Sequence, residues 1–302
     1  MQSLWLIFQL IFCLFLGFAV ATKIPEWLKT CAFKVLPYFS YILLMSIAIE
    51  FSQTLHELKQ PQLILHHALS LACLTSLGAF GCCYALFKFM GYQPSSGRVS
   101  TDLLVKSLIN ISYAFIALGA GYAIAEFGSM LDVHVQLSTW SLLLVFMFLI
   151  GLDLAYSPLD RSWLNWKIML VPTGCILGSV LGALLYACLN QDIVLKDLIM
   201  LSQGYGFYSM SGIVVSQLKN PELGSIALMN DLFREIFAIV LMYLIGWRYP
   251  RAAIASAGAT AMDVTLPMVK QSCGNAFIPH AMVSGFILSV LAPILVSILA
   301  AF

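Results

Sequence analysis

This sequence has few charged residues for its length. Asp, Glu, Lys and Arg make up only 10% of its 302 residues, whereas about 25% is usual in a soluble domain. Hydrophobic residues make up 61%, so a globule of this composition would lack the polar surface it needs in water. The longest polar connection, residues 91–101, is too short to fold alone. The composition predicts a single integral membrane domain over residues 1–302.

Other absences narrow the function. The formal net charge is +1 and no basic run occurs, so no nucleic-acid partner is expected. The 8 cysteines include no CxxC or Cys/His metal spacing and mostly lie in apolar stretches, so we expect helix packing, no disulfide and no metal site. No GxSxG or HExxH motif and no Ser/His/Asp arrangement is present, so an enzyme and a cofactor are not expected.

Long apolar stretches predict the fold class, an all-α polytopic membrane protein. A spanning helix needs about 20 mostly apolar residues. Eight stretches qualify: 4–22, 35–51, 62–89, 103–125, 139–155, 167–189, 224–247 and 277–301. We expect the first to be retained, because no Lys or Arg precedes Leu4 as in a signal peptide. Two weaker segments, 195–217 and 252–272, are rich in Gly, Ser, Ala and Thr and are predicted to be re-entrant or discontinuous.

The distribution of basic residues orients these helices. With eight spans, three basic residues fall on one side (Lys59, Lys196 and Lys219), Arg234 falls inside a span, and eleven fall on the other side: Lys23, Lys29, Lys34, Lys88, Arg98, Lys106, Arg161, Lys167, Arg248, Arg251 and Lys270. Ten full spans would give a ten to four split, so eight are preferred. By the positive-inside rule, both termini are predicted to be extracytoplasmic.

A weak internal repeat relates residues 4–100 to residues 103–200. The sequence Leu-Gly-Phe-Ala at 16–19 is echoed by Leu-Gly-Ala-Gly at 118–121, and the acidic helix end at Glu50 is echoed at Asp153. The copies lie three helices apart and would be inverted in the membrane. Inverted repeats are common in secondary transporters, although two short matches in an apolar alphabet also arise by coincidence.

The strongest functional signal lies inside the seventh apolar stretch, at Asn230, Asp231, Arg234 and Glu235. One charge at bilayer depth costs about 2.5–3.5 kcal/mol or more, so such residues are expected to face protein or water. Arg234 lies three residues after Asp231 and is placed to pair with it. A buried ion pair that only fixes packing is the alternative, but it leaves Glu235 without a cation. A buried carboxylate of this kind favours its neutral form, which suits proton coupling.

The second signal is the stretch from Gly258 to Pro267. Glycine and proline favour a break in the helix here, and Asp263 lies at the break together with Thr260 and Thr265. Non-helical backbone at membrane depth needs protein or a wet cavity around it. A carboxylate beside free carbonyl groups suits an ammonium group, Na⁺ or a proton. A short cytoplasmic loop is the alternative.

The third signal is a glycine-rich stretch in the first weak segment. Its backbone N–H groups are candidates for binding the carboxylate of a substrate, and the alternative is a stretch of small residues that pack helices. The candidate residues are Gly204, Tyr205, Gly206, Tyr208, Ser209, Ser211 and Gly212. Glu50 and Asp153, at helix ends, are secondary candidates that snorkelling to the interface explains equally well.

These segments together resemble the bacterial lysine exporter family, LysO (also known as YbjE). The resemblance is carried by 204–212, 230–235, 258–263, 265–267 and 285–289 with Pro293, and covers about residues 201–302. It implies export of L-lysine and lysine analogues across the bacterial inner membrane by proton antiport, with eight spans and both termini outside. It also implies that Glu235 and Asp263 are the two acidic residues required for transport.

The predicted function is therefore a secondary active exporter whose substrate and proton site uses Glu235 and Asp263. Asp231 and Arg234 are expected to orient Glu235. A Na⁺-coupled carrier of another small amino acid or cation is the first alternative, and a membrane scaffold or sensor is the second. The segments that carry the site span 195–275. The expected partners are lysine and the lipid bilayer, and the sequence leaves open whether the protein forms a homo-oligomer.

Overall fold

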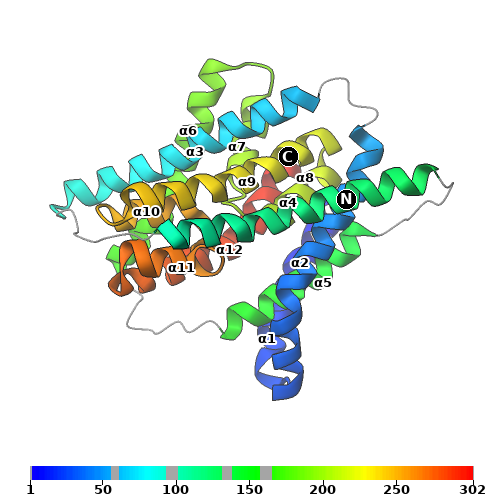
Figure 1. Ribbon diagram of the computed structural model, residues 1–302, viewed down its shortest axis with the longest axis horizontal. Helices are drawn as coiled ribbons and strands as arrows, with labels where there is room; N and C mark the ends of the chain where they lie inside the picture. The colour runs from blue at the N-terminus through cyan, green and yellow to red at the C-terminus, as the bar shows by residue number, and fades with distance from the viewer. Residues whose placement is uncertain (1, 56–60, 93–100, 131–137, 157–164, 302) are drawn as a thin grey trace.

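The computed structural model describes residues 2–55, 61–92, 101–130, 138–156 and 165–301, and within these ranges every regular element is a helix. The long helices cross one another in a bundle (Figure 1). Their bounds are α1 (Gln2–Val20), α2 (Glu26–Leu55), α3 (Pro61–Phe89), α4 (Thr101–Met130), α5 (Thr139–Tyr156), α6 (Trp166–Leu189), α7 (Leu195–Ser202), α8 (Tyr208–Leu218), α9 (Pro221–Leu241), α10 (Pro250–Ala257), α11 (Leu266–Met268) and α12 (Ile278–Ala301).

Four of the described helices are long and apolar enough to cross a membrane: Gln62–Phe89, Thr139–Tyr156, Trp166–Leu189 and Asn275–Ala301. Shorter apolar stretches lie at Phe8–Val20, Lys34–Ile49 and Phe115–Gly128. The remaining long helix, α9, is less apolar because it carries Asp231, Arg234 and Glu235. The predicted all-helical class is confirmed, and the pattern is that of a polytopic membrane protein.

Glycine allows the helices to pack at very short distances. A Cβ atom added to Gly78 of α3 would lie 2.2 Å from the carbonyl oxygen of Gly178 in α6, and the reverse distance is also 2.2 Å. Gly17 of α1 meets the Phe148 carbonyl of α5 in the same way, at 2.1 Å, and Gly121 of α4 meets the Met45 carbonyl of α2 at 2.4 Å. Close backbone approach at small residues is how helices associate in lipid, where apolar burial gives little driving force.

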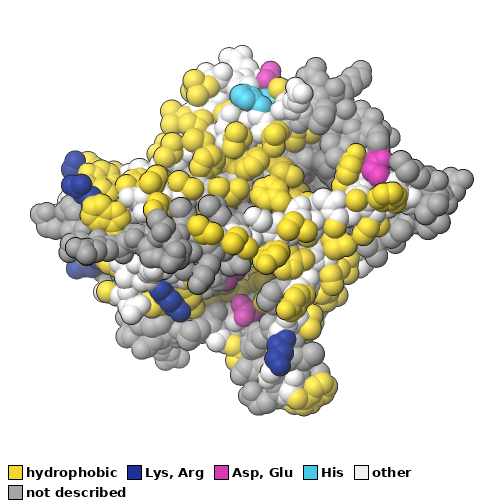
Figure 2. All heavy atoms as spheres, viewed as in Figure 1, with side chains coloured by type: hydrophobic (Ala, Val, Ile, Leu, Met, Phe, Trp, Pro, Cys, Tyr) yellow, Lys and Arg dark blue, Asp and Glu magenta, His cyan; other side chains and the backbone are white. Residues whose placement is uncertain are grey.

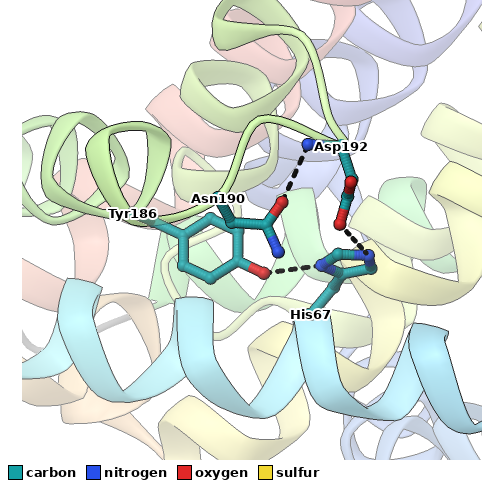
Figure 3. Close-up of polar contacts among 4 residues, drawn as sticks. All are labelled: His67, Tyr186, Asn190 and Asp192. Carbon is teal, nitrogen blue, oxygen red and sulfur yellow. Dashed lines mark hydrogen bonds and ion pairs between the residues drawn. The ribbon is translucent and has the colours of Figure 1, made fainter.

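The central helices α3 and α6 are antiparallel. At one end of the pair, the Nδ1 atom of His67 in α3 is hydrogen-bonded to the Tyr186 hydroxyl of α6 at 2.5 Å, and Asp192 lies 3.9 Å from the other ring nitrogen (Figure 3). At the opposite end, Lys167 of α6 lies over the ring of Tyr92, 5.8 Å from its centroid. These contacts define two ends of the bundle, the His67 end and the Tyr92 end.

The two weaker segments are discontinuous helices, as the sequence predicts. The first consists of α7, a turn at 203–207 and α8, and an ion pair of 3.3 Å joins Lys219 after α8 to Asp197 in the first turn of α7. The second runs from α10 through a break at Gly258 to the π-helical turn Val269–Cys273, whose Cys273 Sγ lies 3.9 Å from the Pro250 carbonyl oxygen. Each segment therefore returns to the end of the bundle at which it begins.

The tips of the two discontinuous segments meet inside the bundle. The first segment starts at the His67 end, and the second starts at the Tyr92 end, where Arg251 lies over the Tyr92 ring. Between these ends, the Ala259 N–H donates to the Tyr205 carbonyl oxygen at 2.9 Å. A Cβ atom on Gly258 would lie 2.4 Å from the same oxygen, so this contact requires glycine. The charged stretch of α9 packs beside this junction.

Candidate functional site

The polar residues of α9 are buried in the interior of the bundle. Asn230, Asp231 and Arg234 are each 0% exposed, and Glu235 is 2% exposed. They lie within two turns of one helix, which begins at the Asn220 cap and Pro221, both favourable at a helix start. The backbone groups that these side chains contact are the Leu201 and Ser202 carbonyls and the Gly206 N–H, which all belong to the first broken segment.

Asp231 holds the glycine-rich turn in place. Its carboxylate accepts hydrogen bonds from the Gly206 N–H at 3.0 Å, the Ser211 hydroxyl at 2.5 Å and the Asn230 side-chain amide at 3.3 Å. A Cβ atom on Gly204 would lie 1.8 Å from the same carboxylate. The turn therefore binds a carboxylate as the sequence indicates, but the carboxylate is the protein's own, and the donors of Gly206 and Ser211 are occupied.

Arg234 joins three helices and the first tip. Its guanidinium donates to the Ser179 hydroxyl at 2.7 Å, the Ser202 carbonyl at 3.2 Å and the Cys175 sulfur at 3.2 Å. It also lies over the Tyr205 ring, 5.5 Å from the centroid. The expected contact ion pair with Asp231 does not form, because α6 and α7 supply the hydrogen-bond acceptors of Arg234, and the two charges interact electrostatically at longer range. Ser179 and Cys175 carry no signal in the sequence that would have assigned them here.

We expect Arg234→Met to destabilise the fold. The substitution keeps an unbranched side chain but leaves the Ser202 carbonyl and the Ser179 hydroxyl without their donor, and Asp231 without a nearby cation. The expected cost is about 2–4 kcal/mol, which corresponds to a fall of roughly 5–10 °C in unfolding temperature for a chain of this size. Thermal unfolding of the purified protein in detergent measures it. Lys270→Met, at an exposed position, is the control, and an equal shift in both variants would contradict this role.

Glu235 is in a different situation from its neighbours. Its Oε2 atom is buried and has no hydrogen-bond partner among the described residues. The charges with which it interacts include Asp263, and it also interacts with the hydroxyl groups of Tyr208 and Tyr41. Tyr41, in α2, is a residue that the sequence analysis missed, because a tyrosine in an apolar helix gives no signal of its own. A buried carboxylate facing a second carboxylate and two hydroxyl groups is a site that attracts a cation.

Asp263 lies at the second tip and is exposed at the surface of the structure. Its Oδ1 atom accepts from the Val264 N–H at 2.6 Å, and it interacts electrostatically with Asp153 of α5 as well as with Glu235. Figure 2 shows acidic side chains in a hollow on a face that is otherwise mostly hydrophobic. Asp263 thus links the buried Glu235 to the outside of the bundle.

The remaining candidates have simpler places. Thr260 donates to the Ala257 carbonyl at 2.9 Å, and Thr265 donates to the Thr260 carbonyl at 3.0 Å, so both hydroxyl groups shape the second tip. Ser209 and Gly212 are buried in α8, and the Tyr205 hydroxyl donates to the Gln203 side chain. The backbone of Glu50 lies in α2, but its side chain is outside the described part of the structure.

Comparison with known proteins identifies the family. Residues 114–300 match the family described as "Lysine exporter LysO". The chain belongs to this family. It is 34% identical over 183 residues to the "Lysine exporter LysO" of Escherichia coli K12, and 32% identical over 162 residues to a "Putative lysine exporter" of Haemophilus influenzae. The first match covers 60% of this chain and 61% of the relative, and the second covers 53% and 83%.

The LysO match extends from within α4 to α12, and so contains Asp153, both broken segments and all the charged residues of α9. No solved structure matches the chain. The alignment with the Escherichia coli protein spans 61% of that protein's length. As a LysO family member with several apolar helices, the chain is a multi-pass membrane protein.

Proposed function

We propose that this LysO family member is a secondary active exporter of L-lysine and lysine analogues, coupled to protons. The observation that carries the proposal is Glu235, a buried carboxylate with no hydrogen-bond partner among the described residues, which interacts with Asp263 at the tip of a broken helix. Both relatives are described as lysine exporters. The side chain of lysine ends in an ammonium group, which two carboxylates and two tyrosine hydroxyl groups are suited to bind.

Proton antiport follows from the cost of the empty site. An empty site with both carboxylates charged is unfavourable, because Glu235 loses its solvation in the interior and the two negative charges repel one another. Loading protons on the return step removes both penalties, so Glu235 and Asp263 bind the ammonium group and protons alternately. Asp231, Asn230 and Arg234 fix the first tip and α9, and so orient Glu235 indirectly.

We assign the carboxylate of the substrate to the same glycine-rich region, but to residues that do not bind Asp231. The donors of Gly206 and Ser211 hold Asp231, so Ser209 and Tyr208, at the start of α8, are the residues we assign to it. Tyr208 interacts with both Glu235 and Asp263. It therefore lies between the residues assigned to the ammonium group of the substrate and Ser209, which is assigned to its carboxylate. Thr260 and Thr265 stabilise the second tip through their hydrogen bonds. Asp153 interacts electrostatically with Asp263.

Counterflow of labelled lysine, arginine and ornithine in proteoliposomes tests the proposal, with wild type compared with Asp263→Asn. We expect lysine counterflow in wild type and a loss of about 100-fold in the variant, since removing one partner of a hydrogen-bonded charge pair costs about 2–5 kcal/mol. Absence of lysine flux in wild type would contradict the assignment of lysine as the substrate. Equal flux in both proteins would contradict the assignment of Asp263 to the site. Flux that responds to Na⁺ instead of pH would favour the Na⁺-coupled carrier, and variants without effect on function would favour a scaffold or sensor.

We infer that the chain crosses the membrane eight times, with α7–α8 and α10–α11 as re-entrant segments. Both segments return to their starting end, which supports this count. The elements of the bundle also form two equivalent sets, in which α1, α2, α3, α7–α8 and α9 correspond in this order to α4, α5, α6, α10–α11 and α12. Helices that pack together in one set have counterparts that pack together in the other. With eight spans, each corresponding pair of spanning helices runs in opposite directions. The repeat of 4–100 and 103–200 then continues into the site segments as an inverted repeat.

The predicted orientation places the His67 end outside the cell. Cys188 is exposed near this end, at the last turn of α6. A membrane-impermeant maleimide is therefore expected to label it in intact cells, and Cys188→Ser is expected to abolish that part of the label. Labelling of Cys188 only after permeabilisation would place the His67 end, and with it both termini, in the cytoplasm.

A further inference from the structure

A pocket with an excess of positive charge lies where the end of α3 meets the start of α10. Its volume is about 290 Å³, and Lys88, Arg248 and Arg251 line it together with Tyr84, Phe87, Tyr92 and Tyr249. No acidic side chain is among the described residues that line it. Among the described residues, the ion pairs are those of His67 with Asp192 and of Lys219 with Asp197, so none of the three basic side chains has a carboxylate partner there.

Aromatic rings hold these three cations but do not neutralise them. The Arg251 guanidinium lies 4.3 Å from the Tyr92 centroid, 5.0 Å from that of Phe87 and 5.1 Å from that of Phe277, and its Nε donates to the His280 ring at 3.2 Å. Lys88 lies over Tyr84 at 5.6 Å, and Arg248 lies over Tyr249 at 5.6 Å. A ring face attracts a cation through its quadrupole and leaves its charge in place. The pocket therefore carries three positive charges and apolar walls.

Two exposed rings place the pocket at the depth of the lipid headgroups. Phe89, directly after Lys88, is 92% exposed, and Trp166 at the start of α6 is 62% exposed. Trp and Tyr beside basic side chains are typical of the membrane interface, and Trp166 directly precedes Lys167. Basic side chains gather at the left edge of the view in Figure 2, where Figure 1 places the end of α3 and α10. A phospholipid headgroup is the ligand present in highest concentration at such a position.

We propose that this pocket binds the phosphate of an anionic phospholipid, with Lys88 and Arg248 on the phosphate oxygens. A guanidinium and an ammonium group suit a phosphodiester, while the tyrosine and phenylalanine rings suit the glycerol and the first methylenes of the acyl chains. The cationic side chain of lysine would be repelled. Arg251 is held in place by three rings and His280, and its charge adds to the positive electrostatic potential of the pocket. Binding would hold the start of α10, which leads to Asp263, against α3.

Lipid retention tests this site without any transport measurement, so its outcome is separate from that of the proposed function. The protein is purified from membranes into nanodiscs with phosphatidylcholine and 10% phosphatidylglycerol as added probe lipids (about one charge per ten lipids), and the lipids that remain after a detergent wash are counted by mass spectrometry. We expect wild type to retain phosphatidylglycerol over phosphatidylcholine. The double variant K88Q/R248Q is expected to retain roughly 25-fold less, since each of the two basic side chains near an anionic lipid contributes about fivefold.

K270Q is the matched control, because Lys270 is exposed near the same end and does not line the pocket. It should retain phosphatidylglycerol as wild type does. Equal retention in the double variant and wild type, or no preference in wild type, would overturn the proposal. Displacement of the lipid by free glycerol phosphate would show a site for a soluble phosphate and would also overturn it. Should the double variant misfold, an increase in the unfolding temperature of wild type on adding phosphatidylglycerol but not phosphatidylcholine supports the site, and no increase contradicts it.

Discussion

Glu235→Gln is expected to reduce lysine flux in proteoliposomes by about 100-fold or more while the protein remains folded. Glutamine keeps the shape of the side chain, and its amide replaces an oxygen that has no hydrogen-bond partner among the described residues, so the packing of α9 should survive. The negative charge that attracts an ammonium group or a proton is lost. Removing one partner of a buried charge pair costs about 2–5 kcal/mol, which corresponds to a loss of about 100-fold or more. Counterflow of labelled lysine measures the effect.

Glu222→Gln is the matched control for this variant. Glu222 lies in the first turn of the same helix and is exposed, so its replacement removes an equal charge without touching the site. The unfolding temperatures of both variants should match wild type. Wild-type flux in Glu235→Gln would remove Glu235 from the transport mechanism, whereas an equal loss in both variants would show that net charge, and not position, matters.

Gly258→Ala is expected to be among the most damaging single-methyl changes in the chain. Gly258 has φ +64° and ψ −127°, a conformation that residues with a Cβ atom avoid. The added Cβ atom would also lie 2.4 Å from the Tyr205 carbonyl oxygen, which accepts the Ala259 N–H. Separation of the two tips costs this hydrogen bond in addition to the strain. We expect a loss of about 3 kcal/mol or more, seen as a fall in unfolding temperature and as loss of lysine flux.

Gly274→Ala separates strain from contact. Gly274 also has a positive φ, +94°, but nothing lies within 4 Å of a Cβ atom built there. The strain of a positive φ is therefore present without the collision between the tips. Gly274→Ala is expected to be the milder variant on both measurements, and an equal effect would mean that the junction of the tips contributes nothing beyond local strain.

The sequence predicts the helical class and the broken segments because both have local causes. Long apolar stretches determine the spans, and Gly206 and Gly258 mark turns with a positive φ that no other residue adopts as easily. The sequence also finds the buried charges of α9, since a charge in an apolar stretch is conspicuous. Their roles as substrate and proton sites stay predictions, which the variants above test.

The partners of these charges could not be predicted, because they come from distant parts of the chain. Spacing along α9 places Arg234 next to Asp231. In the structure, however, the N–H groups of Arg234 donate to Ser179 of α6 and to the Ser202 carbonyl of α7 instead. The sequence predicts that the glycine-rich turn binds the carboxylate of a substrate, and in the structure the turn binds the carboxylate of Asp231. Which anion fills it depends on the packing of α8 against α9, and no local pattern contains that information. Tyr41 was missed for the same reason.

The contact between Tyr205 and Ala259 also limits how the interior can move. Each broken segment is attached at a different end of the bundle, the first by Lys219 and Asp197 and the second by Cys273 and Pro250, while their tips share one backbone hydrogen bond. A tip that withdraws toward its own end must either pull its counterpart along or give up that bond. The movements of the two tips are thereby linked through main-chain atoms, so a substitution has to displace the backbone, as Gly258→Ala would, to break the link.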